Sequence, residues 1–472
     1  MTTEDATLFD TNERPRAPVA PTRTVQLLEG PILRTLLRLT GPNIGEAAAR
    51  IAFVVFDAIY VSWLGTDALA GITLVFPLFI TMQMMSASGL GAGVAAAIGQ
   101  AMGAGRRRDA NALAGHGAMI AVALALAFSL PILVFGPALY RALGASGASL
   151  QAAETYSTIT FAGVIFVWLM NILANAVRGT GNMVVPAGAI IVSALLHLAL
   201  SPLLILGWGP LPSLGIAGAA IAVVASYALG TIVLGVYLLS GRGDICLNPS
   251  AFVPRRKTFA AILGVGSLAA LNVLQIQIVL IISSTLVAGF GAVTLAAFGA
   301  ASRLELLQLP LTFAVGTAVI TMIATNLGAG NVARARQIAW IATAVSAGIG
   351  GAFGIAAYFG ATSWMRLFSE DPAVITVGRD YLTIIAVVLP LMGTGLGLFF
   401  ALLGVGKPAM PFLSGSVRLG IVAALGWSAM HLMDGDFLAL TATFAAGIAA
   451  MAACLIVAGW REFRAAASIR GE

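Results

Sequence analysis

Apolar stretches long enough to cross a lipid bilayer follow one another along almost the whole chain. An α-helix needs about 20 apolar residues to span the hydrocarbon core of a membrane. Of the 472 residues, 59% are hydrophobic and 9% are charged, against about 25% charged in soluble proteins. The chain is therefore predicted to be an all-α polytopic membrane protein with twelve transmembrane helices. They lie roughly at 39–64, 68–98, 112–140, 155–177, 183–206, 214–240, 259–288, 293–325, 336–360, 380–403, 409–431 and 437–460.

The basic residues predict how these helices cross the membrane. With the N-terminus inside, most Lys and Arg residues fall in cytoplasmic segments, Arg178 among them, and only Arg141, Arg366 and Arg379 fall outside. This asymmetry is typical of multi-pass proteins and predicts that both termini are cytoplasmic, in a cell membrane that we expect to be a bacterial inner membrane. The net charge of +6 thus reflects contact with the lipid bilayer, and no nucleic-acid partner is expected.

The chain repeats itself at a constant offset, which predicts two halves. Gly103 and Gly105 recur as Gly328 and Gly330, 225 positions later. A second set repeats at the same offset: Gly179, Gly181 and Pro186 with Gly404, Gly406 and Pro411. Because each half holds an even number of helices, the two have the same orientation, and transporters of this plan bind substrate between the halves. The predicted segments are a disordered cytoplasmic tail (1–30), a six-helix lobe (31–241), a cytoplasmic linker (242–257), a second six-helix lobe (258–460) and a tail (461–472).

A polar stripe runs along the first apolar helix. Asn43, Glu46, Arg50 and Asp57 fall within roughly 60° of one another on a helix that is otherwise compatible with lipid. An ionisable group at bilayer depth costs at least a few kcal/mol, so such groups are candidates for a functional site. Glu46 and Arg50 are four residues apart, so they are either a structural ion pair or part of a substrate site.

Asp57 has no basic residue close to it on its own helix, so we expect it to bind an ion or the substrate. His197, on the fifth helix, reaches a similar depth: the helical rise places the two about 24 Å and 21 Å into the membrane. Since ionisable groups in membranes tend to pair, His197 is predicted to act with Asp57, although a lone His in an apolar helix is also common as a packing residue.

The second half lacks the charged stripe, because Ser283, Asn272 and Ile276 occupy the positions that correspond to Asp57, Glu46 and Arg50. Its candidates for the central cavity are polar residues of the seventh and eighth helices. Arg303 and Glu305 are predicted to be buried but to point to opposite faces, and Glu305 shares its face with Gln308 and Thr312. The predicted substrate-binding residues are Glu46, Arg50, Met82, Met85, Gln275, Glu305 and Gln308, the two methionines having packing as an alternative role.

Motifs for catalysis, metal binding or nucleotide binding are not found in the sequence. The two cysteines and three histidines have no metal-ligand spacing, and Gly404 to Pro408 lacks the spacing and the hydroxyl of a nucleotide loop. We therefore expect no cofactor, no metal, no enzymatic activity and no use of ATP by this chain.

The motifs resemble those of the multidrug and toxic compound extrusion (MATE) family. The resemblance covers all twelve helices and rests on Phe56-Asp57-Ala58-Ile59, Ala68-Leu69-Ala70-Gly71, Gly99-Gln100, Arg178-Gly179-Thr180-Gly181 and Arg303-Leu304-Glu305 with Pro310. It implies a V-shaped pair of lobes and efflux coupled to inward movement of H+ or Na+, and Asp57 matches the coupling carboxylate of the family. Where many members carry an Asn and an Asp-Pro on the fifth helix, this chain has His197 and Ser201-Pro202.

These features predict a secondary antiporter, expected to be a monomer, that exports amphipathic, cationic small molecules in exchange for H+. Asp57, His197 and Ser201 are the predicted ion-coupling residues. Na+ is disfavoured because His197 and Ser201 replace residues that would supply oxygen ligands. The alternative is a flippase or exporter of a lipid-linked or metabolite precursor, but a polyanion would require more basic residues than the sequence places in the membrane.

Overall fold

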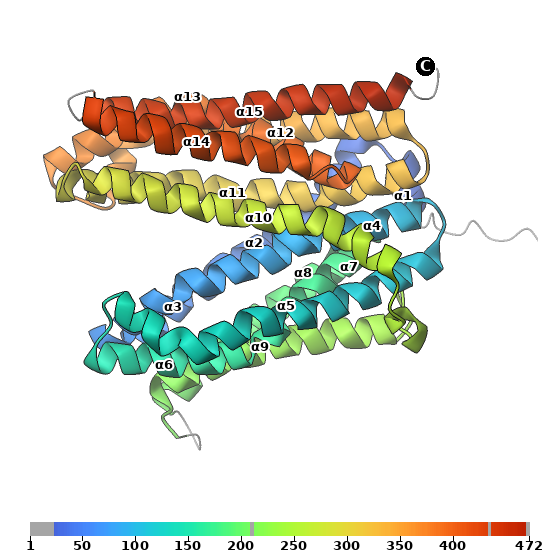
Figure 1. The fold of residues 1–472 in the computed structure, drawn as a ribbon, viewed down its shortest axis with the longest axis horizontal. Coiled ribbons are helices and arrows are strands. Elements are labelled where there is room, and N and C mark those ends of the chain that lie inside the picture. Colours follow the sequence, from blue (N-terminus) through green and yellow to red (C-terminus); the bar gives the residue numbers. More distant parts are fainter. Residues whose placement is uncertain (1–22, 208–211, 433–435, 469–472) are drawn as a thin grey trace, which may run out of the picture.

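The computed structural model describes residues 23–207, 212–432 and 436–468. Within these ranges the chain is helical except for short turns and connecting loops (Figure 1). The helices are α1 (Arg23–Glu29), α2 (Ile32–Ser62), α3 (Thr66–Met84), α4 (Gly91–Gly103), α5 (Arg107–Ala142), α6 (Gly147–Ala162), α7 (Val164–Arg178), α8 (Val184–Leu206), α9 (Gly215–Leu239), α10 (Arg256–Ala288), α11 (Ala292–Gly328), α12 (Val332–Arg366), α13 (Pro372–Val405), α14 (Ala409–Leu432) and α15 (Phe437–Ser468).

The helices account for the twelve predicted membrane crossings. In the described part of the chain, 10 helices are long and apolar enough to span a bilayer, α3 and α4 forming one of them through a π-helical turn at Met85–Leu90. The pair α6 and α7, bent by 46° at Gly163, forms an eleventh. The remaining crossing is α2, whose 31 residues suffice in length but whose polar stripe lowers its hydropathy.

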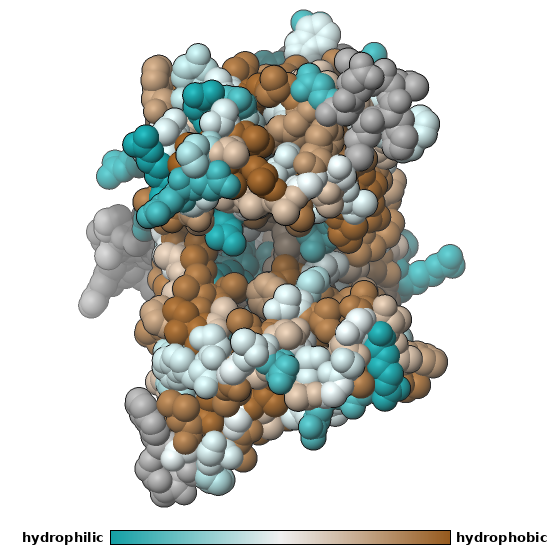
Figure 2. Space-filling model, turned by 90° about the vertical axis from the view of Figure 1, so that its left-hand side faces the viewer, coloured by the Kyte–Doolittle hydropathy of each residue, from teal (hydrophilic) through white to brown (hydrophobic). Residues whose placement is uncertain are grey.

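The helices form two lobes that converge at one end of the molecule and separate toward the other (Figure 1). Helices α2 to α9 form the N lobe, and α10 to α15 form the C lobe. The lobes meet near α1 and α4, at the end where the C-terminus lies; we call this the closed end. Viewed from the opposite, open end, the surface shows a hollow between the lobes (Figure 2).

Glycines of the internal repeat bring the two backbones together at the closed end. A Cβ atom on Gly103 would lie 1.9 Å from the carbonyl oxygen of Thr325, and one on Gly328 would lie 2.1 Å from that of Gln100. Gln100 and Thr325 are themselves 225 positions apart. The two contacts are therefore equivalent: in each, a glycine of one repeat meets the same carbonyl oxygen of the other repeat. Only glycine permits such an approach.

The predicted tails differ from the structure at both ends. Residues 23–29 form α1 instead of a disordered segment, and α15 continues to Ser468 instead of ending at 460. The side chain of Leu27 is 2% exposed, and its carbonyl oxygen accepts hydrogen bonds from Asn326 Nδ2 (3.1 Å) and Arg334 Nε (3.5 Å) of the C lobe. Arg23 pairs with Asp244 in the linker at 3.4 Å. Burial of Leu27 between the lobes explains why this segment is ordered.

Candidate transport site

The polar stripe of α2 faces protein along its whole length. Asn43, Glu46 and Asp57 are only 4%, 8% and 4% exposed. Nearest the closed end, Asn43 Nδ2 donates to the carbonyl oxygen of Ala314 (3.1 Å) and to Thr317 Oγ1 (2.7 Å), both on α11 of the other lobe. The stripe therefore begins at the contact between the lobes and continues into the N lobe.

Glu46 is shared between two arginines. Arg50 Nε donates to Glu46 Oε1 at 3.0 Å, Arg50 Nη2 donates to Asn171 Oδ1 at 3.2 Å, and Arg178 Nη2 donates to Glu46 Oε2. The sequence assigned Arg178 to a cytoplasmic segment, and the structure shows that it is nevertheless buried: Arg178 is the last residue of α7 and is 4% exposed. No signal in the sequence pointed to its partner, because Glu46 lies on another helix, 132 positions away.

Asp57 and His197 lie together in the N lobe. His197 Nε2, on α8, is 3.2 Å from Asp57 Oδ1, and the side chains are 0% and 6% exposed. The two atoms are close but are not aligned for a hydrogen bond. The imidazole ring stacks on Phe53, with ring centroids 3.8 Å apart and planes at 20°. The depths calculated from the helical rise for Asp57 and His197 thus correctly predicted that these two residues lie close together.

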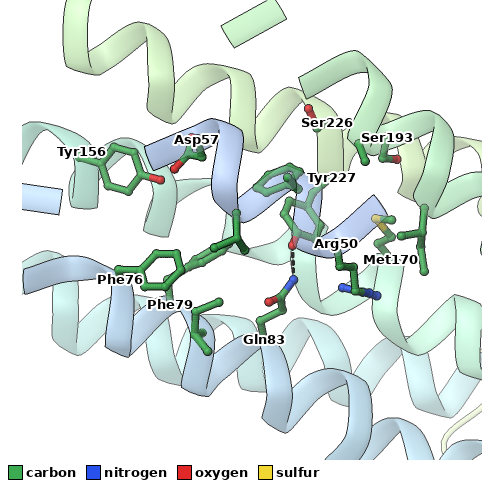
Figure 3. Close-up of a pocket in the computed structure, with 15 residues that line it drawn as sticks. Arg50, Asp57, Phe76, Phe79, Gln83, Tyr156, Met170, Ser193, Ser226 and Tyr227 are labelled. Carbon is green, nitrogen blue, oxygen red and sulfur yellow. Dashed lines mark hydrogen bonds between the residues drawn. The ribbon is translucent and has the colours of Figure 1, made fainter. Parts of the chain in front are cut away.

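A small cavity of about 50 Å³ adjoins this pair and is open to one or two water molecules. Tyr156 on α6 directs its hydroxyl toward Asp57, and Gln83 Nε2 donates to the Tyr227 hydroxyl on the other side of the cavity (Figure 3). Ser201, one turn beyond His197, is fully buried, and its hydroxyl has no hydrogen-bond partner. The sequence analysis missed both tyrosines, because apolar helices often contain tyrosine without a functional role.

A larger cavity of about 460 Å³ lies between the lobes, within the size range of sites for drug-sized ligands. Both walls are largely apolar, but the charged lining residues, Glu46, Arg50 and Arg178, all lie in the N lobe. The C-lobe wall contains one polar residue, Thr317, and otherwise consists of Leu306, Leu309, Pro310, Phe313, Ala314, Ile320 and Phe400. Four residues line both this central cavity and the small one: Arg50, Val54, Ile80 and Gln83. The two spaces are therefore neighbours across the N-lobe wall.

The two predicted methionines lie elsewhere. Met82 and Met85 are 2% and 8% exposed and belong to the apolar core of the N lobe. Met84, between them, lines the central cavity instead. Residues three apart share a helix face, as Met82 and Met85 do, whereas residues one or two apart point in different directions. Which methionine lines the cavity therefore depends on the rotation of this helix, which the sequence did not determine.

The C-lobe candidates also lie away from the central cavity. Glu305 Oε1 accepts a hydrogen bond from the Tyr381 hydroxyl at 2.5 Å, inside the C lobe. Gln308 and Thr312 do share a face, but both are 0% exposed and that face turns toward the lobe interior. Gln275 Nε2 donates to Ser416 Oγ at 2.7 Å, and like Glu305 and Gln308 it is not among the residues that line the cavity.

Arg303 differs from its predicted burial. Its side chain is exposed and lies over the ring of Phe368, 5.4 Å from the centroid. It does point away from Glu305, as their spacing of two residues predicts.

Comparison with known proteins is consistent with this architecture. The chain is 30% identical to the "FAD transporter" of Shewanella oneidensis over 77% of its own length and 79% of that protein's. It is 25% identical to the "Multidrug export protein MepA" of Staphylococcus aureus over 70% of its length and 72% of that protein's. A solved structure described as MATE in the bent conformation superposes with a TM-score of 0.89 at 22% identity, covering 96% of this chain and all of that one. The family model described as MatE matches residues 42–203 and 269–427, one segment in each lobe, and the chain therefore belongs to the MATE family of membrane transporters.

Proposed function

We propose that this protein is a proton-coupled antiporter that exports amphipathic small molecules through the cavity between its lobes. The observation that carries the proposal is the buried Asp57–His197 pair beside a small cavity that borders the central one. A carboxylate and an imidazole are the two side-chain types that exchange protons most readily near neutral pH when their surroundings change.

The geometry supports a coupling route through α2. Protonation of Asp57 removes the charge that holds it toward His197, and the two groups lie on helices that pack against each other. Arg50 is two turns from Asp57 on the same helix and lines both cavities. A rotation or bend of α2 on protonation therefore moves a charged group of the substrate wall, which links proton binding to substrate release.

H+ is favoured over Na+ by the donors around Asp57. A sodium ion requires several oxygen ligands. The side chain of His197, whose ring nitrogen lies next to Asp57, has no oxygen to offer. Tyr156 and Ser201 provide only neutral hydroxyls. A proton, in contrast, requires a single basic group.

The proposed membrane orientation has both termini in the cytoplasm. The open end of the V then faces the outside, so that the conformation described here is one from which substrate leaves the protein. We propose a monomer, since the central cavity is formed by the two lobes of one chain.

Transport into sealed vesicles tests the proposal. Purified protein is reconstituted in sodium-free vesicles, and uptake of a panel of fluorescent organic ions and FAD is measured with an imposed pH gradient. Uptake driven by the pH gradient is expected for the wild type and not for Asp57→Asn. Uptake that requires a Na+ gradient in place of the pH gradient would overturn proton coupling, and a failure of all compounds to move, with the protein folded, would overturn export.

A further inference from the structure

The charged groups on the wall of the central cavity are not balanced. Among the described residues that line it, Glu46, Arg50 and Arg178 are the ionisable ones. One carboxylate thus faces two guanidinium groups, and the wall has a surplus of one positive charge. All three groups lie in the N lobe, on α2 and α7.

Both oxygens of Glu46 are already engaged by arginines. Oε1 accepts a hydrogen bond from Arg50, and Oε2 accepts one from Arg178. A cation that approached Glu46 would meet the repulsion of both guanidinium groups. Because the cavity is lined mainly by apolar groups, that repulsion is screened less than it is in water.

Asp57 does not offer a substitute for Glu46. It lines the small cavity of about 50 Å³ and not the central one. That volume holds water but is well below the roughly 300 Å³ at which sites for drug-sized ligands begin. In the C lobe, Glu305 is engaged by Tyr381 and is not on the cavity wall either.

The arginines retain capacity to bind an anion. The Nε atom of Arg178 is buried and has no hydrogen-bond partner, although the whole residue is only 4% exposed. The side chain of Arg50 is 28% exposed and reaches the cavity from the adjacent turn of the same wall. Guanidinium groups bind carboxylate, sulfonate and phosphate oxygens in pairs, so two of them on one wall suit an anionic head group.

The opposite wall suits an aromatic body. Phe313 and Phe400 meet edge to face, with ring centroids 5.0 Å apart, and Leu309 and Pro310 lie beside them on the cavity surface. Planar apolar groups pack well against such a surface.

We infer that the central cavity selects amphipathic anions, with the acidic group held by Arg50 and Arg178 and an aromatic body packed on α11 and α13. This substrate class rests on the proposed function and differs from the cationic substrate that the sequence suggested. The sequence assigned Arg178 to a cytoplasmic segment, and without that residue the charges of Arg50 and Glu46 cancel. Inclusion of Arg178 changes the wall from neutral to positive.

Two dyes with the same ring system test the sign directly. Fluorescein is anionic and rhodamine 123 is cationic, and both are built on a xanthene ring, so their binding to purified protein in detergent compares charge at nearly constant shape. Fluorescein is expected to bind at least about tenfold more tightly, which corresponds to about 1.4 kcal/mol. Equal affinity, or tighter binding of rhodamine 123, would overturn the inference.

Variants assign the effect to the arginines. Arg50→Gln is expected to weaken fluorescein binding about tenfold, whereas Arg50→Lys retains part of it. Glu46→Gln removes the negative charge that both guanidinium groups share and is expected to tighten fluorescein binding. Arg303→Gln is the matched control, because it removes an exposed arginine of α11 that is not on the cavity wall. If Arg50→Gln is folded, as shown by its melting curve, and binds fluorescein like the wild type, the assignment is wrong.

Binding is measured without any ion gradient, so it is independent of coupling. Loss of proton coupling with anion binding intact would count against the proposed function alone. Proton-driven transport of rhodamine 123 without fluorescein binding would count against this inference alone.

Discussion

Each lobe places a carboxyl group beside a tyrosine, yet the two lobes differ in the third member of the cluster. Tyr156 faces Asp57 in the N lobe, and Tyr381 donates to Glu305 in the C lobe. The two tyrosines are 225 positions apart and are thus equivalent in the repeat, whereas the carboxyl groups come from different helices, α2 and α11. The tyrosine hydroxyl thus occupies the same position in both repeats, whereas the acid comes from α2 in the N lobe and from α11 in the C lobe.

The third member of the N-lobe cluster is an imidazole, and that of the C-lobe cluster is a guanidinium. His197 on α8 lies beside Asp57, while Arg418 on α14 interacts electrostatically with Glu305. An imidazole gains and loses a proton near neutral pH, but a guanidinium stays charged in proteins. The comparison suggests that an acid acts as a switch only where its partner can also change its charge, and this supports the proposal that coupling lies in the N lobe.

The largest effect is expected from neutralising one acid and not the other. Asp57→Asn is expected to abolish transport driven by a pH gradient, whereas Glu305→Gln is expected to retain most of it, since the proposed coupling site does not include the C-lobe acid. Both variants are compared by initial uptake rates at matched protein content. If the two variants lose transport equally, the difference between the lobes has no functional meaning.

The closed end should respond equally in both lobes, because its contacts are reciprocal. Gly103→Ala and Gly328→Ala each force a methyl group against a carbonyl oxygen, and each is expected to destabilise the protein by about 1–3 kcal/mol. Melting temperature in detergent measures the loss. Gly264→Ala on α10 is the control, because a Cβ atom there meets nothing within 4 Å. A tolerated Gly103→Ala alongside a damaging Gly328→Ala would break the symmetry.

A third prediction replaces the nitrogen base of the N lobe with oxygen ligands. The double variant His197→Asn and Ser201→Asp is expected to add a dependence on Na+ to transport, since both new side chains carry oxygens near Asp57. Uptake is measured with and without a Na+ gradient at constant pH. Wild-type and Asp57→Asn proteins provide the reference levels, and an absence of any response to Na+ in a folded double variant would contradict the argument.

The smallest effect is expected from the two tyrosines. Tyr156→Phe and Tyr381→Phe each remove one hydroxyl from a buried acid, worth about 1 kcal/mol in each case. Tyr156→Phe is expected to lower the transport rate a few-fold and Tyr381→Phe to lower only the melting temperature. Measurement of rate and melting temperature on both proteins separates these outcomes, and a rate loss confined to Tyr381→Phe would reverse the roles of the lobes.

The fold followed from the sequence because apolar length and the 225-residue offset are properties of the chain itself. Depth along a helix also follows from sequence, which is why Asp57 and His197 were matched. The rotation of a helix relative to its neighbours does not. Glu305, Gln308 and Thr312 were correctly placed on one face, but that face turned out to line the lobe interior, and only packing between helices decides this.

Arg178 shows a second reason for incomplete prediction. Hydropathy assigns a charged residue at a helix end to water, but Glu46 on another helix neutralises it, and that pairing spans 132 positions. Its discovery required the three-dimensional arrangement of α2 and α7.

The seven-residue helix α1 has a consequence for the contact between the lobes. Its Leu27 carbonyl oxygen is held by Asn326 and Arg334 of the C lobe, and its Arg23 is held by the linker. Separation of the lobes at the closed end must break these bonds, so α1 helps to hold the two lobes together at this end. A force applied to α1 would therefore act directly on the contact between the lobes.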